Sequence, residues 1–210
     1  MADLVICLRH GEKPSNAEHP CDAVRPGDKD GPGFDERGHE DPHSLTIRGW
    51  QRAGALAGTY LCGQLRPIEK LPPVTFLVPR YVHKTTGRDE SARHRPYQTV
   101  YELARRFGIV PSPVRDPDDK PNVHADHSGY VGHLYQQIMD FRGIAVVCWE
   151  HKGLVKLAER LTPRLAPHEW PADGFDAIWR FQRGRLDPTY DFEPLHQDVL
   201  EPAPTKTTTE

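Results

Sequence analysis

The stretch DLVICLRHGEKP, residues 3–14, joins an apolar run to a short polar turn. The apolar run at residues 4–8 contains β-branched side chains, which predicts a strand covered by protein on both faces. A glycine and a proline then interrupt the pattern and end the strand. We therefore expect Arg9 and His10 at the carboxyl end of the strand, the edge where open α/β sheets bind their ligands.

Strand and helix patterns alternate along the rest of the chain. This alternation predicts an α/β fold with a doubly wound, mostly parallel sheet and helices on both faces. Alternating apolar and polar residues at 175–182 predict a half-exposed edge strand. The other expected strands are residues 74–79, 109–114 and 143–150, and the expected helices are residues 45–61, 96–108, 130–141 and 151–161.

Local signals support three of these helices. Thr46 is a suitable N-cap for the first helix, and Pro96 and Gly108 frame the second. Three leucines, at positions 154, 157 and 161, lie on one face of the last helix.

Length and composition predict one domain at residues 1–200 and a disordered tail at 201–210. The hydrophobic share is 37%, and the chain contains 17 glycines and 21 prolines, so extensive loops are expected. Residues 14–43 have the composition of a long loop.

Charge, cysteine content and the N-terminal sequence exclude several classes of protein. A net charge of −3 and a pI near 6.5 argue against a nucleic-acid or membrane partner. No signal peptide is expected, because the apolar run near the start is too short. The four cysteines lack metal-ligand spacing, so we expect a cytoplasmic protein with Cys7 and Cys148 reduced and buried in strands. The oligomeric state stays open.

Four residues form a candidate phosphate site: Arg9, His10, Arg95 and His151. Each is expected at a strand end or shortly after one. Arginine forks pair with phosphate oxygens, a neutral histidine is a nucleophile, and a protonated second histidine stabilises developing charge. Taken singly, each has a plainer interpretation as a turn residue, a solvated arginine or a helix cap. Their combination favours phosphate chemistry.

Four segments resemble, in order, the motifs of the histidine phosphatase (phosphoglycerate mutase-like) superfamily. Arg52, Pro96, Val100 and Lys152 depart from the superfamily pattern. The segments are LRHGEKP at 8–14, LTIRGWQRAGALA at 45–57, SARHRPYQTV at 91–100 and AVVCWEHKGL at 145–154.

The resemblance implies a three-layer αβα fold and a phosphatase that works through phosphohistidine on His10, without metal or other cofactor. Arg9, Arg95 and His151 would complete the phosphate site. Asn16 is similar in position to an asparagine of the mutase-like members, which implies substrate contact, although a loop turn explains it equally well. The substrate would be a small phosphorylated molecule.

The general acid is not evident from the resemblance. One branch of the superfamily has a glutamate between the second arginine and the second histidine, and the other has an aspartate where Lys152 stands. Asp126 is the first candidate, and Glu12 is both a second candidate and a possible substrate contact. The remaining candidates are Asp116, Asp118 and Asp119. A substrate with a good leaving group would need the acid less.

Alternatives to a metal-independent phosphatase remain open at this stage. Histidines and carboxylates at 39–43 and 124–127 have ligand-type side chains, although they match no metal motif and solvated loops explain them better. A phosphomutase on the same fold, or a non-catalytic phospholigand-binding protein, would use the same residues.

Overall fold

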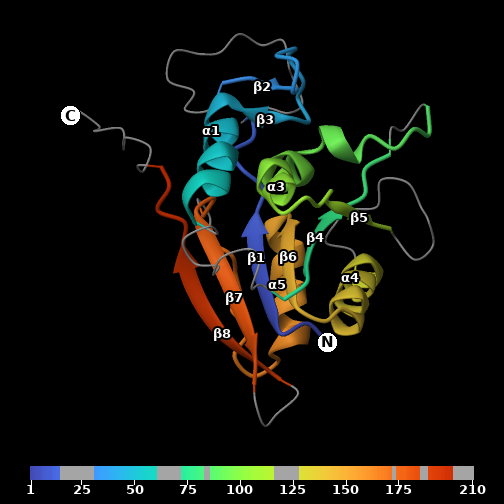
Figure 1. Ribbon diagram of the computed structural model, residues 1–210, viewed down its shortest axis with the longest axis vertical. Coiled ribbons are helices and arrows are strands. Elements are labelled where there is room, and N and C mark those ends of the chain that lie inside the picture. The colour runs from blue at the N-terminus through green and yellow to red at the C-terminus, as the bar shows by residue number, and fades with distance from the viewer. Residues whose placement is uncertain are drawn as a thin grey trace.

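The computed structural model describes residues 1–14, 31–60, 72–82, 86–115, 128–171, 174–184 and 189–200. Its central sheet has six strands in the order β5-β4-β6-β1-β7-β8 (Figure 1). The strands β5, β4, β6 and β1 are parallel to one another, and β7 runs antiparallel to both of its neighbours, β1 and β8. Their bounds are β1 Leu4–Arg9, β4 Val74–Pro79, β5 Ser112–Val114, β6 Ile144–Trp149, β7 Ala177–Arg183 and β8 Tyr190–His196. The predicted mostly parallel sheet is confirmed.

Helices cover both faces of this sheet, as the alternating pattern predicts (Figure 1). The helices are α1 Ile47–Ala55, α3 Arg95–Arg106, α4 Ser128–Asp140 and α5 His151–Leu161, and a π-helical turn, Leu56–Tyr60, continues α1. None of the helices in the described ranges has the length and apolarity needed to cross a lipid bilayer.

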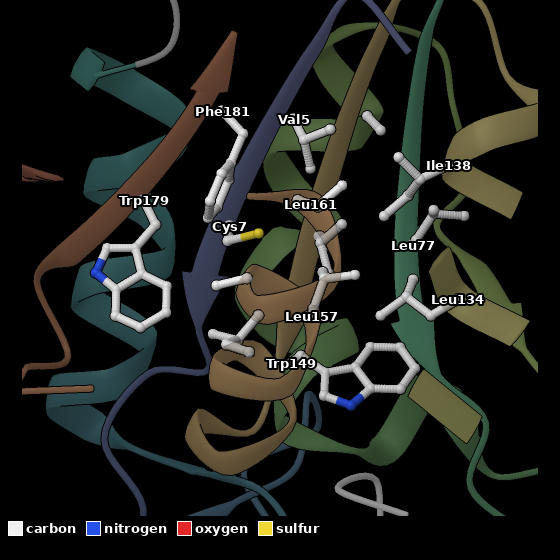
Figure 2. Close-up of a cluster of buried hydrophobic side chains, with 14 of the residues drawn as sticks. Val5, Cys7, Leu77, Leu134, Ile138, Trp149, Leu157, Leu161, Trp179 and Phe181 are labelled. Carbon is white, nitrogen blue, oxygen red and sulfur yellow. The ribbon is translucent and has the colours of Figure 1, made fainter. Parts of the chain in front are cut away.

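One face of the sheet packs against α4 and α5. Figure 2 shows Cys7 and Trp149 on adjacent strands, with Leu134 from α4 and Leu157 from α5 lying against this face. The predicted leucine face of α5 is confirmed, because Leu154, Leu157 and Leu161 are all buried.

The opposite face packs against α1 and α3. Leu8, Phe76 and Cys148 on the strands form this second core with Leu103 of α3 and Leu56 after α1. Cys7 and Cys148 therefore lie in different cores, and both are free and buried as predicted. Burial raises the pKa of each thiol.

The prediction for the C-terminal strands is wrong in one respect. Segment 175–182 is not an edge strand, because β7 lies between β1 and β8. Strand β8, which the sequence pattern does not predict, occupies the edge and exposes Asp191 and Glu193. Polar side chains and Pro194 are tolerated on an edge strand, and they hide the strand pattern.

The loop expected over residues 14–43 also contains a short strand. The two-residue strand β2 Gly33–Phe34 pairs with β3 Leu45–Thr46, directly before α1. Thr46 is the N-cap of α1, as predicted, and its hydroxyl accepts a hydrogen bond from the backbone N–H of Gly49 at 3.2 Å. The first helical turn thus lies beyond the tip of β1 (Figure 1).

Gly49 brings α1 into direct contact with the backbone that follows β1. A Cβ placed on Gly49 would lie 2.6 Å from the carbonyl oxygen of Glu12, far closer than atoms can approach. Gly54 lies on the exposed side of the same helix, and among the described residues no atom would come within 4 Å of its Cβ.

We predict opposite effects of alanine at these two glycines. Gly49→Ala should lower the free energy of unfolding by about 1–3 kcal/mol, because the clash outweighs the gain in helix propensity. Gly54→Ala should raise it by about 0.5–1 kcal/mol. Urea denaturation measures both, and equal effects would contradict the close approach.

Candidate active site

Arg9 and His10 lie where β1 ends, beside the end of β6. Arg9 pairs with Trp149 in the parallel register, and the backbone N–H of His10 donates to the carbonyl of Trp149 at 3.3 Å. Both side chains are buried, with exposed fractions of 7% and 6%. Since α5 begins two residues after Trp149, His151 lies at the same edge of the sheet.

The imidazole of His10 is fixed by its neighbour. Its Nδ1 lies 2.8 Å from the carbonyl oxygen of Gly11. Because a carbonyl only accepts, we assign the proton to Nδ1, which leaves a lone pair on Nε2. In this tautomer, Nε2 is the nucleophilic atom.

His10 is also held in its neutral form. Burial lowers its pKa well below 6.5, and the guanidiniums of Arg95 and Arg9 and the ring of His94 lower it further. The hydrogen bond to Gly11 raises the pKa, but the opposing effects outweigh it. A buried, neutral imidazole among cations is suited to attack an anionic phosphoryl group that those cations attract.

A chain of hydrogen bonds connects this turn to α3. The N–H of Gly11 donates to the hydroxyl of Thr99 at 2.8 Å, and that hydroxyl donates to the carbonyl of Arg95 at 2.8 Å. Within the described part of the chain, no side chain caps the N-terminus of α3. The positive end of the helix and Arg95 therefore lie beside the His10 turn.

Arg95 has an unused donor at this position. In the described ranges its Nε is buried and has no hydrogen-bond partner, while one terminal nitrogen donates to the carbonyl of Pro42 at 3.5 Å. Burial lowers the pKa of the guanidinium, Asp41 and Tyr81 oppose that shift, and Arg9 adds to it. A bound anion would satisfy both the charge and the donor.

Phe175, which sequence analysis missed, packs over this cluster. The guanidinium carbon of Arg9 lies 4.2 Å from the centre of the phenyl ring, and the ring centres of Phe175 and His10 are 6.1 Å apart. This stacking orients the arginine fork and covers the histidine. Phe175 lies just before β7, and its place in an apolar alternation gave no functional signal.

His151 is more exposed than the other three predicted residues. Its side chain is 41% exposed, and its Nδ1 lies 3.8 Å from a carboxylate oxygen of Glu150. Glu150 caps α5 by accepting hydrogen bonds from the N–H groups of Lys152 and Gly153. The structure thus brings Arg9, His10 and Arg95 together and places His151 at the rim beside them.

Glu12 turns away from this cluster and lies against α1. Its buried carboxylate accepts hydrogen bonds from Nε and a terminal nitrogen of Arg52, at 3.0 and 2.6 Å, and lies 3.4 Å from the Nε of Arg48. A role for Glu12 in substrate binding or proton donation stays a prediction. The other predicted residues, Asn16, Asp116, Asp118, Asp119 and Asp126, lie outside the described residues.

The segment 39–43 forms a turn in the structure. Asp41 accepts from the N–H of His43 at 3.0 Å and from the hydroxyl of Ser44 at 2.7 Å. Within the described ranges, no group of three or more potential ligands is arranged to hold a metal ion. The second histidine-rich segment, 124–127, lies outside those ranges.

Comparison with solved structures identifies the fold. A mycobacterial glucosyl-3-phosphoglycerate phosphatase in complex with VO3 matches 91% of this chain and 97% of its own, with a TM-score of 0.50 and 13% identity. A structure described as mycobacterial hydrolase 1 matches 94% and 99%, also with a TM-score of 0.50 and 13% identity. The chain has the histidine phosphatase fold.

A third structure, the protein histidine phosphatase SixA with tungstate, matches 92% of this chain and 97% of its own at a TM-score of 0.48 and 16% identity. No protein-family model and no curated protein sequence matches the chain. At these identities the structural match shows a shared fold and does not by itself establish an activity.

The low pKa of His10 gives a direct test of the site. In an NMR titration, the ring should stay neutral to a pH well below 6.5. Arg95→Gln should raise this pKa because it removes the largest charge effect on it. Arg142→Gln is the control. Arg142 is exposed and lies just before β6, at the opposite end of the parallel strands from His10.

The sign for stability follows from the same shift. The unfolded chain takes up a proton at His10 near pH 6.5 and the folded chain does not, so this residue destabilises the fold progressively as the pH falls below 6.5. A His10 pKa near 6.5 in the folded protein, or a pKa that does not change in Arg95→Gln, would contradict the placement of His10 beside Arg95.

Proposed function

We propose that this protein is a phosphatase that hydrolyses a small phosphorylated substrate through a phosphohistidine on His10. The observation that carries the proposal is the buried, neutral imidazole with its Nε2 lone pair free, held beside two arginines. The histidine phosphatase fold supports it.

In the proposed reaction, Nε2 of His10 attacks phosphorus and the ester P–O bond breaks. The leaving oxygen takes the bonding electrons and a proton. Water then attacks the phosphohistidine, the N–P bond breaks, and inorganic phosphate and the imidazole are released. Arg9, Arg95 and His151 hold the phosphoryl oxygens in both steps.

The arginines supply the positive charge that a metal would otherwise provide, so the proposed reaction needs no metal ion. Asp126 is proposed as the proton donor, and Asn16 as a further substrate contact. The ion pair with Arg52 gives Glu12 a structural role, so Asp126 is the better candidate for the proton donor.

The nucleophile assignment predicts a labelled enzyme intermediate. A radiolabelled phosphate ester should leave an acid-labile, base-stable label on the wild type, and turnover should fall by several orders of magnitude in His10→Ala. His168→Ala is the control, because that histidine is exposed. Label or normal turnover in His10→Ala would show that another residue is the nucleophile.

The acid assignment predicts a dependence on the leaving group. Asp126→Asn should slow hydrolysis of an alkyl phosphate by about 10²–10⁴-fold, since the alkoxide needs the proton in the transition state. Hydrolysis of p-nitrophenyl phosphate should change far less, because nitrophenolate leaves without it. Equal effects on the two substrates would show that Asp126 is not the acid.

A further inference from the structure

We propose that Gln197 is a positioning residue of the phosphate site, which acts by fixing Phe175 and, through that ring, the guanidinium of Arg9. This inference rests on the proposed function, because it concerns how tightly the site binds a phosphoryl group. Gln197 directly follows the edge strand β8 and lies outside all four motif segments. Its exposed fraction is nevertheless only 3%.

Three successive carbonyl groups, those of residues 174–176, each accept a hydrogen bond. The indole Nε1 of Trp170 donates to the carbonyl of Gly174 at 2.8 Å. The side-chain Nε2 of Gln197 donates to the carbonyl of Phe175 at 3.1 Å, and the backbone N–H of Gln197 donates to the carbonyl of Asp176 at 2.7 Å. Gln197 therefore supplies two of the three bonds that hold this segment.

These bonds determine where the side chain of Phe175 points. A peptide group is planar, so a hydrogen bond that holds its carbonyl also holds the orientation of the plane. The carbonyl of Gly174 belongs to the peptide before Phe175, and the carbonyl of Phe175 belongs to the peptide after it. With both planes held, the backbone dihedrals of Phe175 and the direction of its Cα–Cβ bond are fixed.

The groups that donate these bonds are themselves well anchored. Trp170 is buried, and its ring centre lies 4.4 Å from that of Trp179 on β7. Gly174 permits the tight turn after Trp170, since a Cβ there would lie 2.9 Å from the carbonyl oxygen of Pro171. Gln197 continues β8, which pairs with β7 along its whole length.

Phe175 connects this segment to the phosphate site. The guanidinium carbon of Arg9 lies 4.2 Å from the centre of the phenyl ring. An arginine that stacks through the face of its guanidinium keeps its N–H bonds in the plane of the group, directed past the ring. A guanidinium held in this way loses less conformational entropy when it binds phosphate. Gln197 thus raises the affinity for phosphate without touching it.

The hydrogen bonds of Gln197 favour this role over a purely structural one. In the described ranges its Oε1 is buried and has no hydrogen-bond partner. A buried acceptor without a partner costs stability, which offsets the contribution of the bond from Nε2. We therefore assign the main effect of this side chain to the position of Phe175.

The first measurement is a spectroscopic signature of the stacking. In the wild type, the NMR signal of the Arg9 Nε–H proton should be shifted upfield, because the guanidinium lies over the face of a phenyl ring. The signal is identified by its absence in Arg9→Lys. Phe175→Leu should abolish the upfield shift, Phe175→Tyr should retain it, and Gln197→Met should reduce it.

The second measurement is the affinity for inorganic phosphate by calorimetry. Phe175→Leu should weaken binding about three- to tenfold, because the arginine must then be ordered on binding. Gln197→Met should weaken it by up to the same factor. In the double variant Gln197→Met should add nothing to Phe175→Leu, because it acts through the ring.

Gln182→Met is the matched control. It removes the same kind of bond, from a glutamine Nε2 to the carbonyl of Asp3 at 2.9 Å, at the start of β1. Neither the Arg9 signal nor the phosphate affinity should change in this variant. Urea denaturation shows whether each variant is folded, and Gln197→Met alone decides the question if Phe175→Leu does not fold.

The role of Gln197 is overturned if the wild type lacks the upfield shift, or if Gln197→Met leaves both the shift and the affinity unchanged. A full additional loss in the double variant overturns it as well. If the wild type binds phosphate and His10 is labelled, these results leave the proposed function intact. If the wild type does not bind phosphate, the phosphate site itself is wrong and both proposals fall.

Discussion

The position of the Gly11 backbone is the constraint on which the rest of the site depends. Its N–H is held by Thr99 of α3, and its carbonyl orients the ring of His10. A Cβ at this position would lie 3.2 Å from the backbone of Gly49, so a side chain here would require α1 to shift slightly. The backbone of one residue thereby fixes the tautomer of His10 and its placement relative to two helices.

The ion pair next to Gly11 keeps negative charge away from the proposed phosphate site. Glu12 directly follows Gly11, and an unpaired carboxylate there would repel a phosphoryl group. Its bonds to Arg52 turn it to the far side of the backbone. Buried ion pairs contribute little net stability when compared with apolar side chains, so the main effect of this pair is geometric. It also explains why Arg52, which departs from the superfamily pattern, is buried in α1.

The sequence predicts the centre of this fold better than its margins, because central parallel strands are apolar throughout. The strands β1, β4 and β6 follow from such runs, and Arg9, His10 and Arg95 follow from their places relative to them. Strand β8 does not, since its edge position permits charged residues. Phe175 could not be identified either, because a ring that stacks on an arginine looks like any core residue.

The positive charges of Arg95 and Arg9 determine at which stage of the proposed reaction His10 is most nucleophilic. Burial, Arg95 and Arg9 lower the pKa of His10 before an anion binds, which keeps Nε2 unprotonated. When a phosphoryl dianion lies against these arginines, its charge offsets their field at the imidazole, and the electron pair on Nε2 becomes more basic. In the proposed reaction, His10 is thus protected from protonation before substrate binds and gains nucleophilic strength when phosphorus is in reach. A metal ion in place of the arginines would compete for that lone pair, whereas guanidinium groups only donate hydrogen bonds. A site built from arginines therefore suits a histidine nucleophile.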